Sequence, residues 1–295
     1  MKRKRVKLSS LDVALMLLAA SALFYLAYRV KVGLHYQWNW GAIPQYLFRF
    51  DEQAGKWVPN LLTQGLLTTI RLSFWATLLA ALLGTIGGFF RISPSLFKRL
   101  VGRTLVELIR NTPPLVLIFI FYFFVSDQIM PFLGVDALVR SSSPGIRAAL
   151  TLFFAPPHFL SAFLSATLTL AFIEAAYITE IVRAGIQSIE KGQFEASAAL
   201  GLSSWQQMRH VILPQAIRRI LPPLAGQFIS TIKDSAIVSV ISIPELTFQG
   251  MELMAATYLT FECWITITVL YLVLTLSLSL AVERLEIHMA RSDFQ

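Results

Sequence analysis

The side chains that could do chemistry in this chain are few, and most lie in apolar segments. Glu174 and Tyr177 stand three residues apart in one segment, and Lys233 and Asp234 are neighbours in another. An ionisable group in hydrocarbon is costly, so it normally faces a cavity, a pathway or a partner helix. These four residues are therefore the candidates for binding a small polar solute. Lys233 and Asp234 point about 100° apart on a helix, so pairing with other helices is an equally open interpretation.

The sequence contains no grouping of residues that is typical of an enzyme. It has no G-x-x-x-x-G-K-[ST] phosphate loop, because its one Gly-Lys pair, Gly55-Lys56, is followed by Trp57. The four histidines are scattered without metal-ligand spacing, and Cys263 is the only cysteine. We therefore expect no catalytic residue, no metal site and no cofactor in this chain.

The composition is that of an integral membrane protein. Hydrophobic residues make up 56% of the chain and charged residues only 14%, against about a quarter in soluble chains. Apolar runs of spanning length predict six transmembrane helices in one bundle. They cover approximately residues 11–28, 61–90, 111–130, 159–181, 221–243 and 259–282. Small residues in a span permit close helix approach, and the second span carries Gly84, Gly87 and Gly88.

Three segments outside the core of this bundle leave alternatives open. The first apolar run follows five positive charges and is either a cleaved signal peptide or, as we expect, an uncleaved span. In the loop 29–60, Trp38, Trp40 and Trp57 suit either a membrane–water interface or the protein's own outer surface. The long loop 127–158 has no assigned role, and a short interfacial helix is expected at 150–154.

The distribution of positive charge predicts the orientation. With both termini in the cytoplasm, 17 of the 25 Lys and Arg residues fall in inner segments, six in outer loops and two in spans. Cytoplasmic segments of membrane proteins carry such an excess. The net charge of +8 is thus explained without nucleic acid.

The same orientation places a hydrophilic stretch, residues 190–214, in the cytoplasm. Ala196, Ala199 and Leu200 recur at helical spacing, and Gly201 follows where a left-handed residue commonly ends a helix. Ser204 and Gln207 resemble a capping box for a second helix, and Pro214 is expected to mark the boundary before the next span. The stretch is either a solvated connection or a short helix that docks into another protein.

Motifs in this stretch resemble a known family. Glu195-Ala196, Gly201 and Ile212-Leu213-Pro214 resemble the EAA loop of ABC-importer permeases. The segments 106–116, 174–196 and 214–246 resemble the polar amino acid branch, which serves glutamate, glutamine, histidine, arginine and related solutes. The resemblance covers roughly residues 65–283. It implies an all-α, type I importer bundle in a bacterial inner membrane, with a domain at 61–285, an extra helix and loop at 1–60, and a tail at 286–295.

The resemblance also implies roles for individual residues. Arg110 and Pro113 match a signature at the start of the third span, although RNTPP also reads as a capped helix start. Glu180 and Arg183, which we expect to pair structurally, match another part of the signature. The residues implied in coupling to an ATPase are Glu195, Ala196, Ala199, Gly201, Arg209 and Pro214.

The partners implied by the family are a cytoplasmic ABC ATPase dimer, a second permease subunit, identical or homologous, and a periplasmic amino-acid-binding protein. ATP and magnesium would then bind on the ATPase, and the chain itself would contact membrane lipids. Two alternatives remain at this point. One is the same architecture serving another polar solute, and the other is an ion-coupled secondary transporter using Glu174 and Asp234, although no internal repeat of the kind typical of such transporters is found.

Overall fold

The structure is a computed structural model, and it describes residues 9–33, 36–53 and 55–292. The chain divides into two units, Met1–Trp40 and Gly41–Gln295. The first unit contains the helix α1 (Ser10–Gly33), which begins with the apolar run predicted as the first span. Part of this helix, Ser10–Tyr25, is apolar but shorter than the other candidate spans.

The second unit begins with short elements that lead into the first long helix. These are η1 (Trp40–Ala42, starting at the unit boundary), α2 (Pro44–Leu47), β1 (Phe48–Asp51) and β2 (Lys56–Pro59). The strands form an antiparallel pair in which Phe48 faces Pro59, and Phe50 packs edge-on against Trp57. Thr63 donates to the Leu47 carbonyl at 2.7 Å, which fastens the end of α2 to the following helix.

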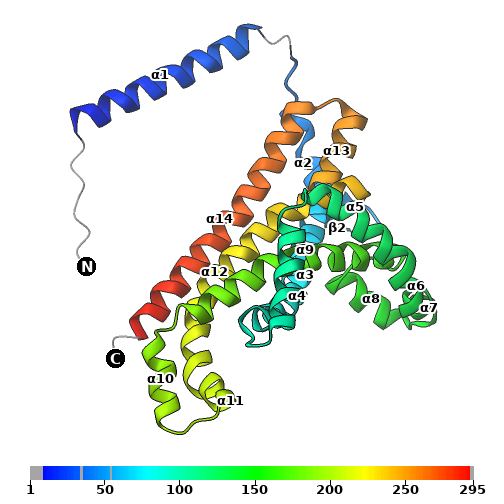
Figure 1. The fold of residues 1–295 in the computed structure, drawn as a ribbon. Helices are drawn as coiled ribbons and strands as arrows, with labels where there is room; N and C mark the ends of the chain where they lie inside the picture. Colours follow the sequence, from blue (N-terminus) through cyan, green and yellow to red (C-terminus); the bar gives the residue numbers. More distant parts are fainter. Residues whose placement is uncertain (1–8, 34–35, 54, 293–295) are drawn as a thin grey trace. The chain divides into compact units, whose positions relative to one another are not determined.

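Five helical segments of the described chain are long and apolar enough to cross a membrane, which agrees with the predicted second to sixth spans. They are α3 (Leu61–Ile92); Pro114–Leu133, built of α5 (Pro114–Phe124), η2 (Val125–Ile129) and α6 (Met130–Leu133); Pro157–Gln187, built of η3 (Pro157–Phe159) and α9 (Leu160–Gln187); Ser204–Ile241; and the first part of α14 (Thr260–Ser292). Figure 1 shows α3, α9, α12 and α14 as the long helices of this unit.

The helix α9 is the best buried of these spans and packs in parallel along α3. Glycines allow this approach, because a β-carbon added to Gly84 would lie 2.7 Å from the Ile178 side chain. One added to Gly88 would lie 2.5 Å from Val182. Both distances are shorter than real side chains tolerate, so these glycines make close helix packing possible, as the sequence predicts.

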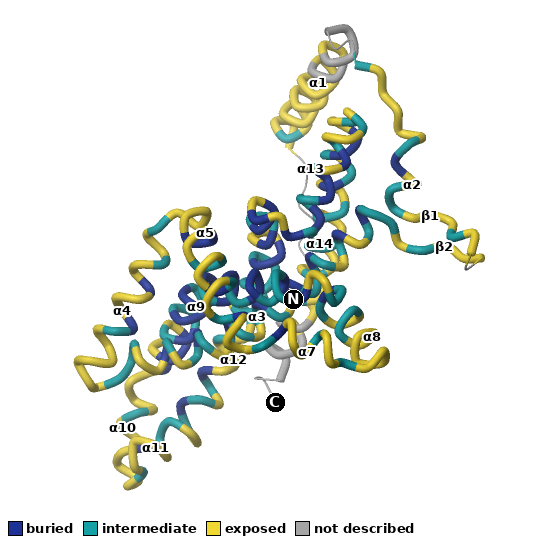
Figure 2. Tube along the Cα trace, turned by 90° about the vertical axis from the view of Figure 1, so that its right-hand side faces the viewer, coloured by how far each residue is buried: buried dark blue, intermediate teal, exposed yellow. Residues whose placement is uncertain are grey.

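Shorter helices connect the spans. The helix α4 (Leu96–Arg110) joins α3 to α5, and α7 (Val135–Ser141) and α8 (Pro144–Phe153) lie between α6 and α9. The expected helix at 150–154 is therefore longer and starts earlier, because Ser143 caps it and Pro144 occupies its first position. Figure 2 shows α8 exposed along most of its length.

The fifth predicted span differs most from its expected form. One helical run extends from Ser204 to Ile241, through α11 (Ser204–Gln207), the π-helix η4 (Met208–Ile212), α12 (Leu213–Asp234) and the 3-10 helix η5 (Ser235–Ile241). Pro214 is therefore not a boundary, and the prediction that a new helix starts near Leu221 is wrong. Pro214 lies in the first turn of α12, just after the π-helical turn. The i→i+5 hydrogen bonds of that turn make room in the helix for a residue that lacks a backbone N–H.

The run ends at a polar connection to α13 (Leu246–Thr257). The Glu245 side chain accepts hydrogen bonds from the Thr247 and Phe248 amides at 2.9 and 2.8 Å, and from the Tyr271 hydroxyl of α14 at 2.8 Å. Thr69 of α3 lies 3.4 Å from the same carboxyl and accepts from the Leu246 amide at 3.2 Å. Burial raises the pKa of Glu245 above its usual range, although the two amide hydrogen bonds lower it. We call these residues the Glu245 cap.

Candidate functional site

The stretch singled out in the sequence forms a helical elbow, made of α10 (Lys191–Ala199), α11 and η4. Gly201 stands at the bend with φ +75°, as predicted, and its amide donates to the Ala198 carbonyl at 2.9 Å. A capping box starts α11, but it is formed by Ser203 and Gln206, so the prediction of Ser204 and Gln207 is wrong by one residue. The chain thus turns within the four residues that separate α10 from α11. We call this element the elbow.

The elbow leaves an apolar surface open. Ala196 and Ala199 are exposed, Leu200 is 81% exposed and Trp205 is 67% exposed. Glu195 and Arg209 are also exposed. An apolar face flanked by charges, at the tip of a short helix, is typical of a surface that another protein covers.

The root of the elbow, by contrast, is well anchored. Phe194 and Met208 pack against a buried cluster that contains Ile189 and Ile212. Gln215 of α12 donates to the Gln193 side chain at 3.1 Å, and Arg219 donates to the Ser188 carbonyl. A force on the elbow would therefore be transmitted to α9 and α12.

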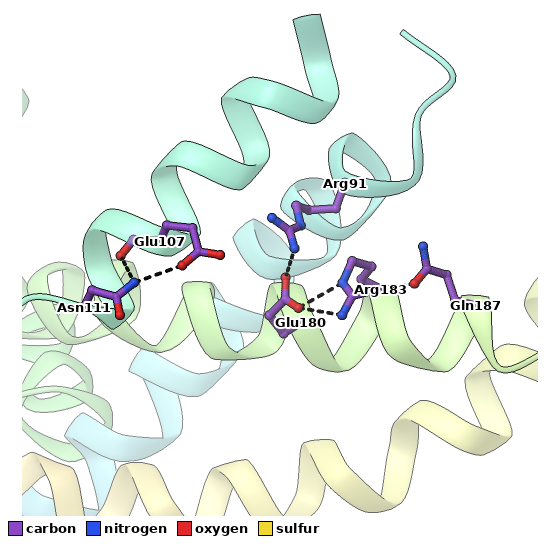
Figure 3. Close-up of polar contacts among 6 residues, drawn as sticks. All are labelled: Arg91, Glu107, Asn111, Glu180, Arg183 and Gln187. Atoms are coloured by element: carbon purple, nitrogen blue, oxygen red, sulfur yellow. Dashed lines mark hydrogen bonds and ion pairs between the residues drawn. The ribbon is translucent and has the colours of Figure 1, made fainter. Parts of the chain in front are cut away.

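An ion-pair cluster lies near the same end of the bundle (Figure 3). Glu180 of α9 pairs with Arg183 at 2.8 Å and with Arg91 of α3 at 3.0 Å. Arg183 also donates to Gln187. The Glu180–Arg183 pair agrees with the prediction, whereas Arg91, which completes the cluster from another helix, was not predicted. The cluster fixes the end of α3 against α9.

A cavity of about 480 Å³ opens beside this cluster, between α9 and α12. The polar side chains that line it include Arg110, Tyr177, Glu180, Arg219 and Gln227. The Arg110 guanidinium lies over the Tyr177 ring, 5.6 Å from its centroid, which is a favourable cation–π geometry. The cavity volume lies in the range of small-molecule sites, and the cavity surface is mostly apolar with a few polar side chains.

Glu174 lies deeper, next to the residues at the end of α12. It is 1% exposed and accepts a hydrogen bond of 2.7 Å from the Gln227 amide. Thr231 and Asp234 also interact with its carboxyl. Two carboxyl groups so close repel each other unless a proton or a cation is shared between them.

The structure therefore brings together only some of the predicted pathway residues. Glu174 and Asp234 meet, and Tyr177 contacts Arg110 rather than Glu174. Lys233 and Asp234 are both exposed in this subunit and lie at the end of α12, not in the middle of a span. Gln227 was missed, because a neutral amide 53 residues from Glu174 carries no spacing signal.

Residues 76–291 match the family described as binding-protein-dependent transport system inner membrane component.

This chain belongs to that family.

Its curated relatives include the glutamine transport system permease protein GlnP of Escherichia coli (strain K12), 33% identical over 82% of this chain and 98% of that protein. The glutamate/aspartate import permease protein GltJ of the same strain is 32% identical over 79% of this chain and 87% of that protein. A crystal structure of an amino acid ABC transporter with histidines contains a chain that is 34% identical, with a TM-score of 0.62, covering 77% of this chain and 94% of that one.

Membership of this family confirms several of the predictions made from the sequence. The chain is a multi-pass inner-membrane permease with an all-helical transmembrane fold, and it is a non-catalytic subunit. The short strand pair β1–β2 does not alter this class, because it lies ahead of the spans.

Proposed function

We propose that this permease imports polar amino acids across the inner membrane. The relatives named above are permeases for glutamine and for glutamate and aspartate, and a similar solved transporter carries the name amino acid ABC transporter. The observation that carries the proposal is the match over most of the chain, together with a cavity of suitable size between α9 and α12 that includes a few polar side chains.

We further propose the partners that the chain lacks. A dimer of ABC ATPases binds the elbow and holds ATP and magnesium, a second permease subunit, identical or homologous, completes the pathway, and a periplasmic binding protein delivers the amino acid. The exposed face of Ala196, Ala199 and Leu200 supports the ATPase contact. Charged Glu195 and Arg209 beside it orient the elbow in the ATPase groove.

In this proposal the elbow converts ATPase movement into movement of the spans. Its anchors to α9 and α12, through Phe194, Gln193 and Arg219, transmit the displacement. The signature residues Glu180 and Arg183 keep α9 fixed to α3 through Arg91, so the helices move as one body. Arg110 ends α4 and lines the cavity, and Pro113 immediately precedes α5. Closure of the ATPase pair then turns the pathway outward, and hydrolysis resets it.

The substrate path in this proposal runs from the cavity to Glu174. The ammonium group of an amino acid would donate hydrogen bonds to the Glu174 and Asp234 carboxyls. The carboxylate of the amino acid would form an ion pair with the Arg110 guanidinium. Gln227 connects the two regions, because it lines the cavity and donates to Glu174. Tyr177 holds the Arg110 guanidinium in place, and Lys233 lies beside Asp234 on the exposed face.

Uptake competition tests this path. Radiolabelled glutamine uptake into cells carrying Glu174→Gln is measured against a panel of unlabelled amino acids, with Glu252→Gln, an exposed acid on α13, as the matched control. We expect Glu174→Gln to change the order of competitors and the control to keep it. An unchanged order in both variants removes Glu174 from the substrate site. Uptake that survives loss of the ATPase would instead indicate an ion-coupled transporter.

A further inference from the structure

The length of α3 provides a measure of depth in the membrane. Arg71 and Arg91 are the two charged residues of this helix, and they stand 20 residues apart. At 1.5 Å per residue they are separated by about 30 Å, which is the thickness of the hydrocarbon core. We therefore expect the two guanidinium groups to lie at the two boundaries of the core, with Arg91 on the side of the elbow and Arg71 on the side away from it.

The C-terminal end of α8 is fixed to α3 just inside the Arg71 boundary. The Trp75 indole donates to the Phe153 carbonyl at 2.9 Å, and its ring stacks on Phe154 with centroids 4.7 Å apart. Trp75 follows Arg71 by four residues, about 6 Å along the helix. A helix held at this depth cannot extend freely into water.

The exposed face of α8 is apolar. Ile146 is 52% exposed and Phe153 is 58% exposed. They share one face of the helix, because they are seven residues, or about two helical turns, apart. Ala149 lies between them on the same face, whereas Ala148 lies on the opposite one. Arg147 is the one charge of α8, and its guanidinium donates to the Arg140 carbonyl at 3.0 Å.

This apolar face lies next to an exposed apolar surface of α3, which we expect to face lipid. On α3, next to the attachment point, Phe74 is 51% exposed and Leu78 is 52% exposed. Both lie between Arg71 and Arg91, where we expect acyl chains to cover them. The apolar face of α8 begins where this lipid-facing surface reaches the boundary.

We propose that α8 is an interfacial helix that lies in the bilayer on the side away from the elbow. Its Ile146–Ala149–Phe153 face is buried among phospholipid acyl chains, and Arg140 and Arg147 lie at the level of the phosphate groups. Amphipathic helices bind a bilayer in this way, with the apolar face about 5–10 Å below the headgroups. The contact assigns the segment between the third and fourth predicted spans a membrane-anchoring role, independent of which solute is transported.

Spin-label accessibility tests the proposal on the full chain in vesicles of phosphatidylethanolamine and phosphatidylglycerol. Single cysteines replace Ile146, Ala149 and Phe153 on the apolar face, and Ala148 and Thr151 as controls on the other side of the helix. The native Cys263 is buried and becomes Ser. The Phe153→Cys variant keeps the backbone carbonyl that Trp75 binds. Collisions of each label with oxygen, which partitions into lipid, and with a water-soluble nickel chelate are then compared.

We expect labels on the apolar face to meet oxygen more than the nickel chelate, and the controls to show the reverse. Equal and high access of the nickel chelate at all five positions would place α8 in water and overturn the proposal. Exclusion of both reagents from the apolar face would also overturn it, because a protein surface, and not lipid, would then cover the helix. Neither result depends on uptake, so the test stands apart from the proposed transport function.

Discussion

The Glu245 cap and the elbow lie at opposite ends of the helical run Ser204–Ile241, and they are built in contrasting ways. The Glu245 carboxyl is fully buried and is satisfied by groups from α3, α13 and α14. The elbow has a packed root, but its tip exposes Leu200 and Trp205. The polar groups of the Glu245 cap find their hydrogen-bond partners within the chain, whereas folding of the chain leaves the apolar surface of the elbow exposed.

This contrast indicates where a partner acts. A buried polar network holds one arrangement, because any displaced group loses its hydrogen bond in a medium of low polarity. The exposed apolar side chains at the tip of the elbow do not contribute to the packing of its root, so we expect them to contact a second protein. We therefore expect substitutions at the cap to change stability and substitutions at the elbow to change coupling.

The largest effect is expected for a bulky residue on the open face of the elbow. Ala199→Trp should lower uptake by about tenfold or more, since losing 1.4 kcal/mol of a docking contact already costs a factor of ten. The amount of protein in the membrane should stay the same, because the Ala199 side chain is exposed. Uptake and immunoblotting of membrane fractions measure the two quantities. Lys191→Gln, an exposed change at the start of α10, is the control, and normal uptake in Ala199→Trp would remove the contrast.

The next effect is a loss of stability at the cap. Glu245→Ala removes the cap of α13 and leaves the Tyr271 hydroxyl without its carboxylate acceptor, at a combined cost of about 3 kcal/mol. We expect a lower midpoint of thermal unfolding in detergent, and uptake per folded molecule that remains near normal. Glu252→Ala, on the exposed side of the same helix, should leave the midpoint in place. A normal midpoint in Glu245→Ala would mean that the network stabilises little.

A smaller effect is expected in the ion-pair cluster near the elbow. Glu180→Gln leaves Arg91 and Arg183 without their carboxylate, and the two arginine side chains are 14% and 30% exposed. Because water reaches them in part, the cost should be about 1–2 kcal/mol, between that of surface and buried pairs. Thermal unfolding of Glu180→Gln beside Glu180→Ala measures it. If both variants unfold at the wild-type midpoint, the cluster does not hold α3 to α9.

The smallest effect sharpens the account of the cap. Thr69→Val keeps the shape of the side chain but removes the acceptor for the Leu246 amide. One hydrogen bond of this kind contributes about 1 kcal/mol, so the unfolding midpoint should fall less than in Glu245→Ala. Thr68→Val, at the half-buried position next in sequence, provides the comparison. A larger loss than in Glu245→Ala would place the centre of the network at Thr69.

The sequence predicted the elements whose signals are local. The five long spans follow from apolar runs, and the elbow follows from a polar stretch with Gly201 at its bend. The continuous helix through Pro214, Pro222 and Pro223 was not predictable in the same way, because rules for proline describe the average helix and not one with a π-helical turn before it.

Contacts between distant residues were also beyond the sequence. Glu174 was recognised as a costly charge in a span, but its partner Gln227 depends on how α9 packs against α12. Glu245 was overlooked, because Glu is not among the preferred helix caps and its other partners, Thr69 and Tyr271, come from separate helices. The partners in such hydrogen-bond networks depend on tertiary packing. The spacing of residues along the sequence does not predict them.

The central claim is that a separate ATPase grips the elbow from the cytoplasm. Cross-linking from Ala199→Cys tests it most directly, because Ala199 is exposed and the native Cys263 is buried. In inverted membrane vesicles that contain the assembled transporter, a short maleimide–benzophenone reagent attached at position 199 should join it to the ATPase on illumination. The same reagent attached to Gly145→Cys on α8 should give no such product. Labelling of position 199 by an impermeant maleimide from the periplasmic side, or no cross-link to any nucleotide-hydrolysing chain, would contradict the account.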